Sequence, residues 1–121
     1  QYESAVDIAL GNSVTAPVAG TNTTLGLVAT NISLSKAQLK KIAEMAHDGM
    51  ARAIRPIHTQ FDGDTVFAVS VPGSEAEMTA YAEAQVNSIG IAAAKALELA
   101  IVDAVSCAKS VGGVVASCDW Q

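Results

Sequence analysis

The sequence has few aromatic and few basic residues. Of its 121 residues only 4% are aromatic, and 7 Lys and Arg stand against 12 Asp and Glu, which gives a net charge of −5 at pH 7. The basic residues form no cluster or stripe of the kind that marks a surface for nucleic acid or for an anionic membrane. We therefore expect neither nucleic acid nor a membrane among the partners.

Long hydrophobic runs and cysteines are also scarce. The most apolar late stretch, Ile89 to Val105, contains three charged residues and is not typical of a membrane span. The first residues lack the basic and apolar segments of a signal peptide. The two cysteines, Cys107 and Cys118, are too few for a disulfide framework or a metal site. We expect reduced thiols in a cytoplasmic protein with no metal and no cofactor; a single late disulfide is the alternative.

The residues that are abundant predict one domain of helices and strands. Half of the sequence is hydrophobic, and its length suits a single domain. Ser35 and Gln38 form a capping box at the start of one helix, and Pro56 ends that helix. Ser74 and Glu77 form a second capping box before a long Ala-rich and Leu-rich segment. The pattern predicts strand, helix, strand and long helix in this order, over residues 24–30, 35–55, 65–71 and 74–108.

Both predicted strands are apolar along nearly their whole length. Strands of this kind are usually buried on both faces, with neighbours on each side. Because two strands alone make a poor sheet, we expect another polypeptide, or copies of this one, to complete it. The predicted fold class is α/β, a layered sandwich with helices packed on a β-sheet.

Thr23 stands where the composition changes. Residues 11–22 are mostly small or hydroxylated and contain Pro17 and Gly20, which is typical of a linker, and the first strand follows directly. A threonine hydroxyl needs a base, and an N-terminal threonine has one in its own α-amine, whose pKa is about 8. Attack of the Thr23 hydroxyl on the Asn22 carbonyl would cut the Asn22–Thr23 bond and create that amine. The plainer alternative is an ordinary threonine at the start of a strand.

The segment Asp62-Gly63-Asp64 precedes the second strand. Residues two apart on a strand point the same way, so the two carboxylates are expected to share a site, where like charge raises the pKa of one of a pair. An Asp-Gly turn without chemistry is the alternative. His47 and His58 look isolated and lack metal-ligand spacing, so structural hydrogen bonding is the favoured role for each.

Three motifs resemble a known family. They are Asn22-Thr23-Thr24-Leu25, the run from Ala46 to Ile54, and the run from Asp62 to Ala68. In this order and spacing they resemble the P1 peptidase family, which contains DmpA-type aminopeptidases and nylon-oligomer hydrolases. The chain looks most like the nylon-hydrolase branch, where the nucleophile is a Thr after Asn and an Asp-Gly-Asp follows. The aminopeptidase branch typically has a Ser after Gly, and later often Ser-Gly-Glu.

The resemblance implies a self-cleaving precursor with an N-terminal-nucleophile fold. Residues 1–22 then end the α portion, and residues 23–121 belong to the β subunit. Thr23 is implied as nucleophile and new N-terminus, with Asn22 as the last α residue and Asp62 and Asp64 around the nucleophile. The α portion of the same precursor is implied to complete the sheet and to supply further site residues, including a lysine and an asparagine, and αβ units are implied to form homo-oligomers.

The expected function is therefore hydrolysis of an amide bond in a small amide or peptide. A DmpA-type aminopeptidase acting on short peptides is an alternative within the family. A non-catalytic assembly subunit, with its Asn22–Thr23 bond uncut, is the alternative from another class. Acyl transfer to an amine is a third, weaker reading of the same nucleophile.

Overall fold

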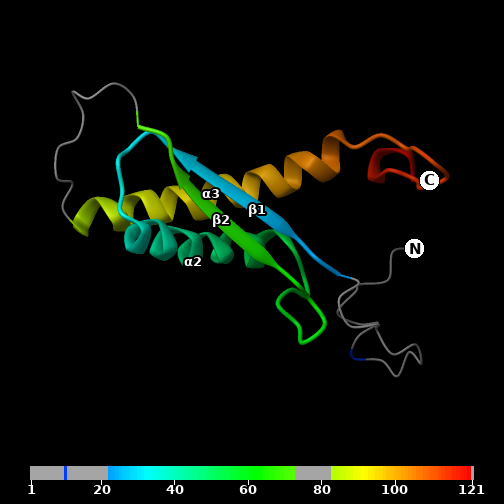
Figure 1. Ribbon diagram of the computed structural model, residues 1–121. Coiled ribbons are helices and arrows are strands. Elements are labelled where there is room, and N and C mark those ends of the chain that lie inside the picture. Colours follow the sequence, from blue (N-terminus) through cyan, green and yellow to red (C-terminus); the bar gives the residue numbers. More distant parts are fainter. Residues whose placement is uncertain (1–9, 11–21, 73–82, 121) are drawn as a thin grey trace.

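The computed structural model describes residue 10, residues 22–72 and residues 83–120. The order of elements is strand, helix, strand, helix, as predicted (Figure 1). The predicted linker, apart from Asn22, and the predicted capping box of Ser74 and Glu77 lie outside the described residues. The elements are β1 (Leu25–Thr30), α2 (Lys36–Ala53), β2 (Thr65–Ser70), α3 (Glu83–Cys107) and a 3-10 turn, η2 (Ser117–Asp119).

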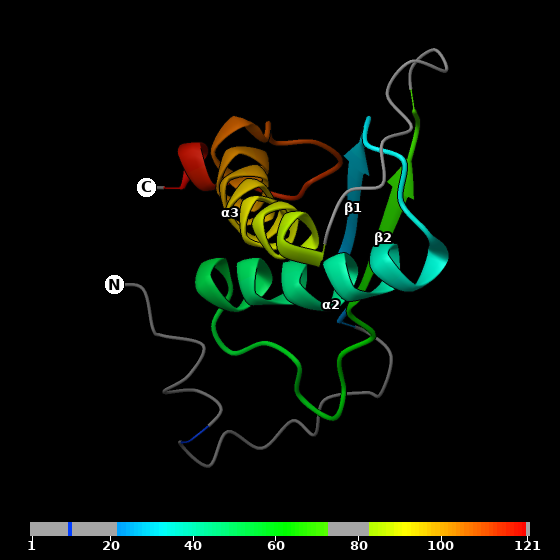
Figure 2. The same cartoon turned by 90° about the vertical axis from the view of Figure 1, so that its left-hand side faces the viewer.

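The two strands are parallel neighbours joined through α2. Leu25 pairs with Thr65 and Thr30 pairs with Ser70, without a register break between them. The helices α2 and α3 pack against each other and lie on the same face of the sheet, behind the strands in Figure 1 and beside them in Figure 2. The core lies between this face and the helices and consists of Ile42, Ala46, Met50, Val66, Val86, Ala93 and Leu97.

Local signals set both ends of α2. The Ser35 hydroxyl accepts a hydrogen bond from the Gln38 N–H at 3.3 Å, and the Gln38 side chain accepts one from the Ser35 N–H at 2.9 Å. This reciprocal pair is the predicted capping box. At the other end the Ile54 N–H donates to the Met50 carbonyl, two residues before Pro56. The predicted helix is therefore confirmed to within about two residues at its end.

A glycine allows α2 and α3 to touch through their backbones. A Cβ atom added at Gly49 would lie 2.1 Å from the Ala94 carbonyl oxygen. A distance this short excludes any side chain at position 49, because the atom in the way belongs to a helix backbone. The apolar stripe of α2, with Ile42 and Met50 fully buried, is held against α3 by this contact.

The expectation that both strands are buried on both faces is wrong for the described residues. Burial alternates along each strand: Gly26 and Val66 are buried, but Leu25, Leu27 and Phe67 are 70%, 66% and 57% exposed. The physical reason is that both helices pack on one face and leave the other without a cover. That a further chain covers the open face stays a prediction.

The C-terminal segment turns back after α3. Val111 and Val114 form a short antiparallel bridge around Gly112 and Gly113, which have φ angles of 60° and 81°. Among the described residues, neither helix combines the length and the apolar character that a bilayer span requires. The cytoplasmic location stays a prediction.

Candidate functional site

Parallel pairing continues beyond the strands and brings Thr23 to the Asp-Gly-Asp segment. Asn22 forms an isolated parallel bridge with Asp62, and the Gly63 N–H donates to the Asn22 carbonyl at 2.9 Å. One step further, the Thr65 N–H donates to the Thr24 carbonyl at 3.0 Å. In this register Thr23 lies opposite Gly63, between the two aspartates of the neighbouring segment.

The absence of a side chain at Gly63 leaves room for the Thr23 hydroxyl. A Cβ atom added at Gly63 would lie 2.9 Å from Oγ1 of Thr23, closer than ordinary contact. Thr23 itself is exposed. The hydroxyl therefore lies over a glycine at an exposed position.

Asp64 is bound to the residue that follows Thr23. Its Oδ1 accepts the backbone N–H of Thr24 at 2.9 Å. Its Oδ2 accepts two hydrogen bonds from His58, from the backbone N–H at 3.2 Å and from ring atom Nδ1 at 2.9 Å. Only 5% of the Asp64 side chain is exposed. The carboxylate thus has a fixed orientation at the N-terminal end of β1.

These contacts favour the ionised form of Asp64. Burial raises the pKa of the Asp64 carboxyl, but the hydrogen bonds from Thr24 and His58 outweigh it, so the pKa lies below its usual value. We expected repulsion between the two carboxylates to raise the pKa of one of them, but the pKa of Asp64 is not raised. The reason is that three N–H donors stabilise the ionised form. Asp64 is a carboxylate at neutral pH and acts as a hydrogen-bond acceptor.

Asp62 has a different partner. Its Oδ2 accepts the Thr59 N–H at 2.7 Å, while the Asp62 N–H donates to the Thr59 carbonyl at 3.1 Å. The side chain therefore closes the turn that leads into β2. Asp62 lies beside Thr23 through the backbone pairing with Asn22, and its turn contact resembles the structural alternative considered for this segment.

The two histidines lie together, which the sequence did not indicate. His47 Nδ1 and His58 Nε2 are 3.4 Å apart, and the ring centroids are 4.9 Å apart in an edge-on arrangement. His58 has a positive φ of 57°, in the left-handed region. The expectation that the histidines are isolated is wrong, because the loop after α2 folds back and places His58 between His47 and Asp64.

No metal centre is found in the described part of the chain, where no group of three or more His, Cys, Asp or Glu side chains could hold an ion. Cys107 and Cys118 are exposed free thiols. The reduced state expected from the sequence stays a prediction.

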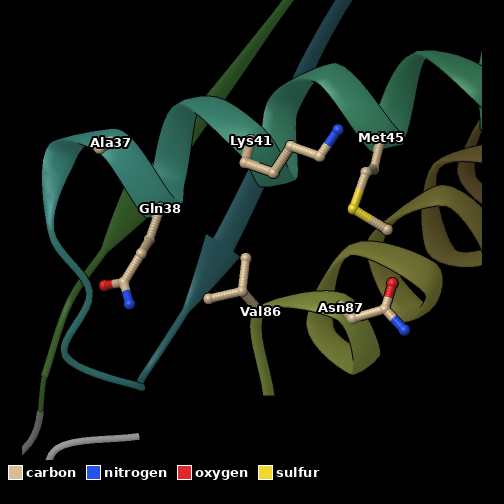
Figure 3. A pocket seen from close by; sticks show the side chains of 6 residues that line it. All are labelled: Ala37, Gln38, Lys41, Met45, Val86 and Asn87. Atoms are coloured by element: carbon tan, nitrogen blue, oxygen red, sulfur yellow. The ribbon is translucent and has the colours of Figure 1, made fainter. Parts of the chain in front are cut away.

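A pocket of about 370 Å³ lies between the first three turns of α2 and the start of α3 (Figure 3). It is open to solvent, and three of its six lining residues are polar. The start of α2 follows the C-terminal end of β1, whereas Thr23 precedes the N-terminal end, so the pocket and the Thr23 site lie at opposite ends of the sheet. The pocket is lined by Ala37, Gln38, Lys41, Met45, Val86 and Asn87.

Comparison with known proteins shows the family of the chain. The sequence matches peptidase family S58 over residues 3–117. The chain belongs to peptidase family S58. It is 41% identical over 109 residues to an uncharacterized aminopeptidase of Mycobacterium leprae, and 45% identical over 100 residues to one of Mycobacterium tuberculosis. These matches cover 84% and 77% of this chain.

A third relative is named as an endohydrolase, not as an aminopeptidase. Over 49 residues, 40% of this chain, the sequence is 45% identical to the 6-aminohexanoate-oligomer endohydrolase of Paenarthrobacter ureafaciens, of which 14% is covered. The predicted family is confirmed, with relatives of both names; which branch is nearer stays a prediction. The chain spans about 30% of the length of the aminopeptidase relatives.

Proposed function

We propose that the full-length protein is a hydrolase of amide bonds that uses Thr23 as its nucleophile. The observation that carries this proposal is the register of β1 and β2, which sets Thr23 over the bare Gly63 and between Asp62 and Asp64. The family and the names of the relatives support a peptidase or amidase. The assignment of Thr23, and of Asp62 and Asp64 as site residues, is our own.

The first reaction is self-cleavage between Asn22 and Thr23. The Thr23 hydroxyl oxygen bonds to the Asn22 carbonyl carbon, the C–N bond breaks, and the nitrogen takes up the hydroxyl proton. Water then hydrolyses the resulting ester and releases an Asn22 carboxylate and a free Thr23 amine. The Gly63 N–H, 2.9 Å from the Asn22 carbonyl oxygen, is placed to stabilise negative charge on that oxygen.

The second reaction is turnover of substrate. The free α-amine accepts the hydroxyl proton as Thr23 attacks the substrate carbonyl, and water later releases the acyl group. Asp64 fixes the backbone of Thr24 and so holds Thr23 in place. We propose that further donors for the substrate oxyanion come from the rest of the protein, since the chain spans about 30% of the length of the aminopeptidase relatives.

Hydrolysis assays on the full-length protein test this function. The substrates are aminoacyl p-nitroanilides, short peptides and 6-aminohexanoate oligomers, which represent the two kinds of relative. Thr23→Ala is expected to abolish hydrolysis of every substrate that the wild type accepts. Thr30→Ala makes the same change at the other end of β1 and is expected to keep the activity. Turnover by Thr23→Ala at the wild-type rate contradicts the mechanism. Acyl transfer is distinguished from hydrolysis by adding amine acceptors, because transfer forms new amides.

We further propose that the rest of the same precursor covers the open face of the sheet, and that the resulting units form homo-oligomers. The exposed Leu27 and Phe67 support the first part, because apolar side chains in neighbouring strands are costly to leave in water. Leu27→Glu in the full-length protein is expected to reduce the yield of soluble, assembled protein, measured by light scattering. Ala51→Glu, an exposed site on α2, is the control. Normal assembly of Leu27→Glu contradicts this part.

A further inference from the structure

Three side chains form a continuous line from α2 to the residue after Thr23. His47 Nδ1 lies 3.4 Å from His58 Nε2, His58 Nδ1 lies 2.9 Å from Asp64 Oδ2, and Asp64 Oδ1 lies 2.9 Å from the Thr24 nitrogen. The line connects a helix, a loop and the N-terminal end of β1. The function proposed above uses only its last member.

The chemistry of the groups fixes where the hydrogens lie. An ionised carboxylate is only an acceptor, so His58 Nδ1 carries a hydrogen that it donates to Asp64. When His58 is neutral, its Nε2 is an acceptor and His47 Nδ1 donates. When His58 is protonated, its Nε2 donates to His47 instead. For the 3.4 Å contact to be a hydrogen bond in either state, one of the two facing nitrogens must carry a hydrogen and the other must accept it.

The backbone of His58 is held in an unusual conformation by the same contacts. Its φ of 57° lies in the left-handed region, which non-glycine residues adopt only uncommonly, although His is one of the types enriched there. In this conformation both the backbone N–H and the ring Nδ1 reach one oxygen of Asp64. His58 is 37% exposed and Asp64 is 5% exposed, so the line opens to solvent at His58.

We propose that His58 is a positioning residue of the Thr23 site, and that His47 holds the His58 ring in the orientation this requires. His58 binds Oδ2 of Asp64 so that Oδ1 remains aimed at the Thr24 N–H, which fixes the nucleophile's backbone. The two ring nitrogens of His58 face Asp64 on one side and His47 on the other. The role assigned to His58 in catalysis rests on the proposed function of Thr23.

Two substitutions at position 58 separate the ring from the backbone. His58→Gly keeps the left-handed conformation and the backbone N–H but removes the ring. His58→Asn also tolerates that conformation, and its side-chain N–H₂ takes the place of Nδ1. His47→Ala removes the support behind the ring. All three are compared with wild type in the full-length protein, with kcat, KM and the pH dependence of kcat as readouts.

The expected result is a loss in kcat that Asn restores. His58→Gly is expected to lower kcat by about 10- to 100-fold with KM changed less than about twofold, because a misplaced nucleophile affects the chemical step. His58→Asn is expected to recover at least half of that loss on a logarithmic scale. His47→Ala is expected to lower kcat less than His58→Gly does, because the His58 ring is still present but has lost the contact that orients it.

A measurement that needs no activity accompanies the assays. Nitrogen NMR of the histidine rings is expected to show a hydrogen on His58 Nδ1 in wild type and in Thr23→Ala, and to show its resonance shifted in Asp64→Asn. If Thr23→Ala retains turnover, the proposed function fails whatever the NMR shows. If Thr23→Ala is inactive but His58→Gly keeps the wild-type kcat and pH profile, the role of His58 is overturned and that of Thr23 stands. Equal losses of kcat in His58→Gly and His58→Asn also overturn the role proposed for His58.

Discussion

The backbone N–H of Thr24 donates to Oδ1 of Asp64 at 2.9 Å, and this bond joins the start of β1 to the segment before β2. A carboxylate is therefore fixed beside the residue that we propose as the nucleophile, Thr23. The bond exists because the two strands are parallel and in register, so residues far apart in sequence meet at the same end of the sheet. The predictions below follow from this arrangement and from the packing that supports it.

Gly63→Ala is expected to slow both self-cleavage and turnover. The new methyl group would lie 2.9 Å from Oγ1 of Thr23 and push the hydroxyl away from its position. A displacement of this kind reduces rates by about 10- to 100-fold. The half-time of self-cleavage, followed by denaturing gel after rapid synthesis, measures the effect. Gly90→Ala, whose added methyl has the Met45 side chain as its nearest neighbour, is the control and is expected to cleave at the wild-type rate. Equal half-times for Gly63→Ala and wild type contradict the placement of the hydroxyl.

Gly49→Ala is expected to destabilise the fold by about 3 kcal/mol, at the upper end of the cost of overpacking. The methyl group would lie 2.1 Å from the Ala94 carbonyl oxygen, so α2 and α3 must separate. At Gly90 the added methyl meets the flexible side chain of Met45, so Gly90→Ala is expected to cost less. Urea unfolding of the two variants gives the comparison. A smaller loss for Gly49→Ala than for Gly90→Ala would show that the helices do not touch at Gly49.

Asp64 is expected to make the fold sensitive to acid. Because the pKa of Asp64 is lowered in the folded state, the protein loses stability as the pH falls below the carboxyl's ordinary value of about 3.9, through the lower folded value. At pH values above that range, Asp64 makes its full contribution to the free energy of unfolding. Asp64→Asn is expected to lower the free energy of unfolding at pH 7 and to flatten its decline in acid. Asp48→Asn, at an exposed position on α2, is the control. An unchanged acid limb in Asp64→Asn contradicts the assignment.

The parts of the fold that local signals determine could be predicted. The capping box of Ser35 and Gln38 and the breaker Pro56 determine α2 within a few residues, because each acts through neighbours in sequence. The nearness of Thr23 to Asp62 and Asp64 was also expected, from the resemblance to a family and from carboxylates at the start of a strand. The structure adds the register that produces it.

The parts set by distant contacts could not be predicted. His58 looked isolated because its conformation depends on contacts with Asp64 and His47, which are not visible in the sequence. No pattern within the loop predicts a histidine in the left-handed region. The open face of the sheet was missed for a related reason. An apolar strand such as β1 shows that both faces avoid water, but it does not show whether the cover comes from the same segment of chain.

The most direct test of the central claim is the intact mass of the full-length protein under denaturing conditions. Cleavage before Thr23 is predicted to give two polypeptides, one ending at Asn22 and one beginning at Thr23. Thr23→Ala is predicted to give a single uncut chain. A wild-type protein that is active yet shows only the uncut mass would contradict the account, because Thr23 would then have an amide nitrogen and no amine to act as its base.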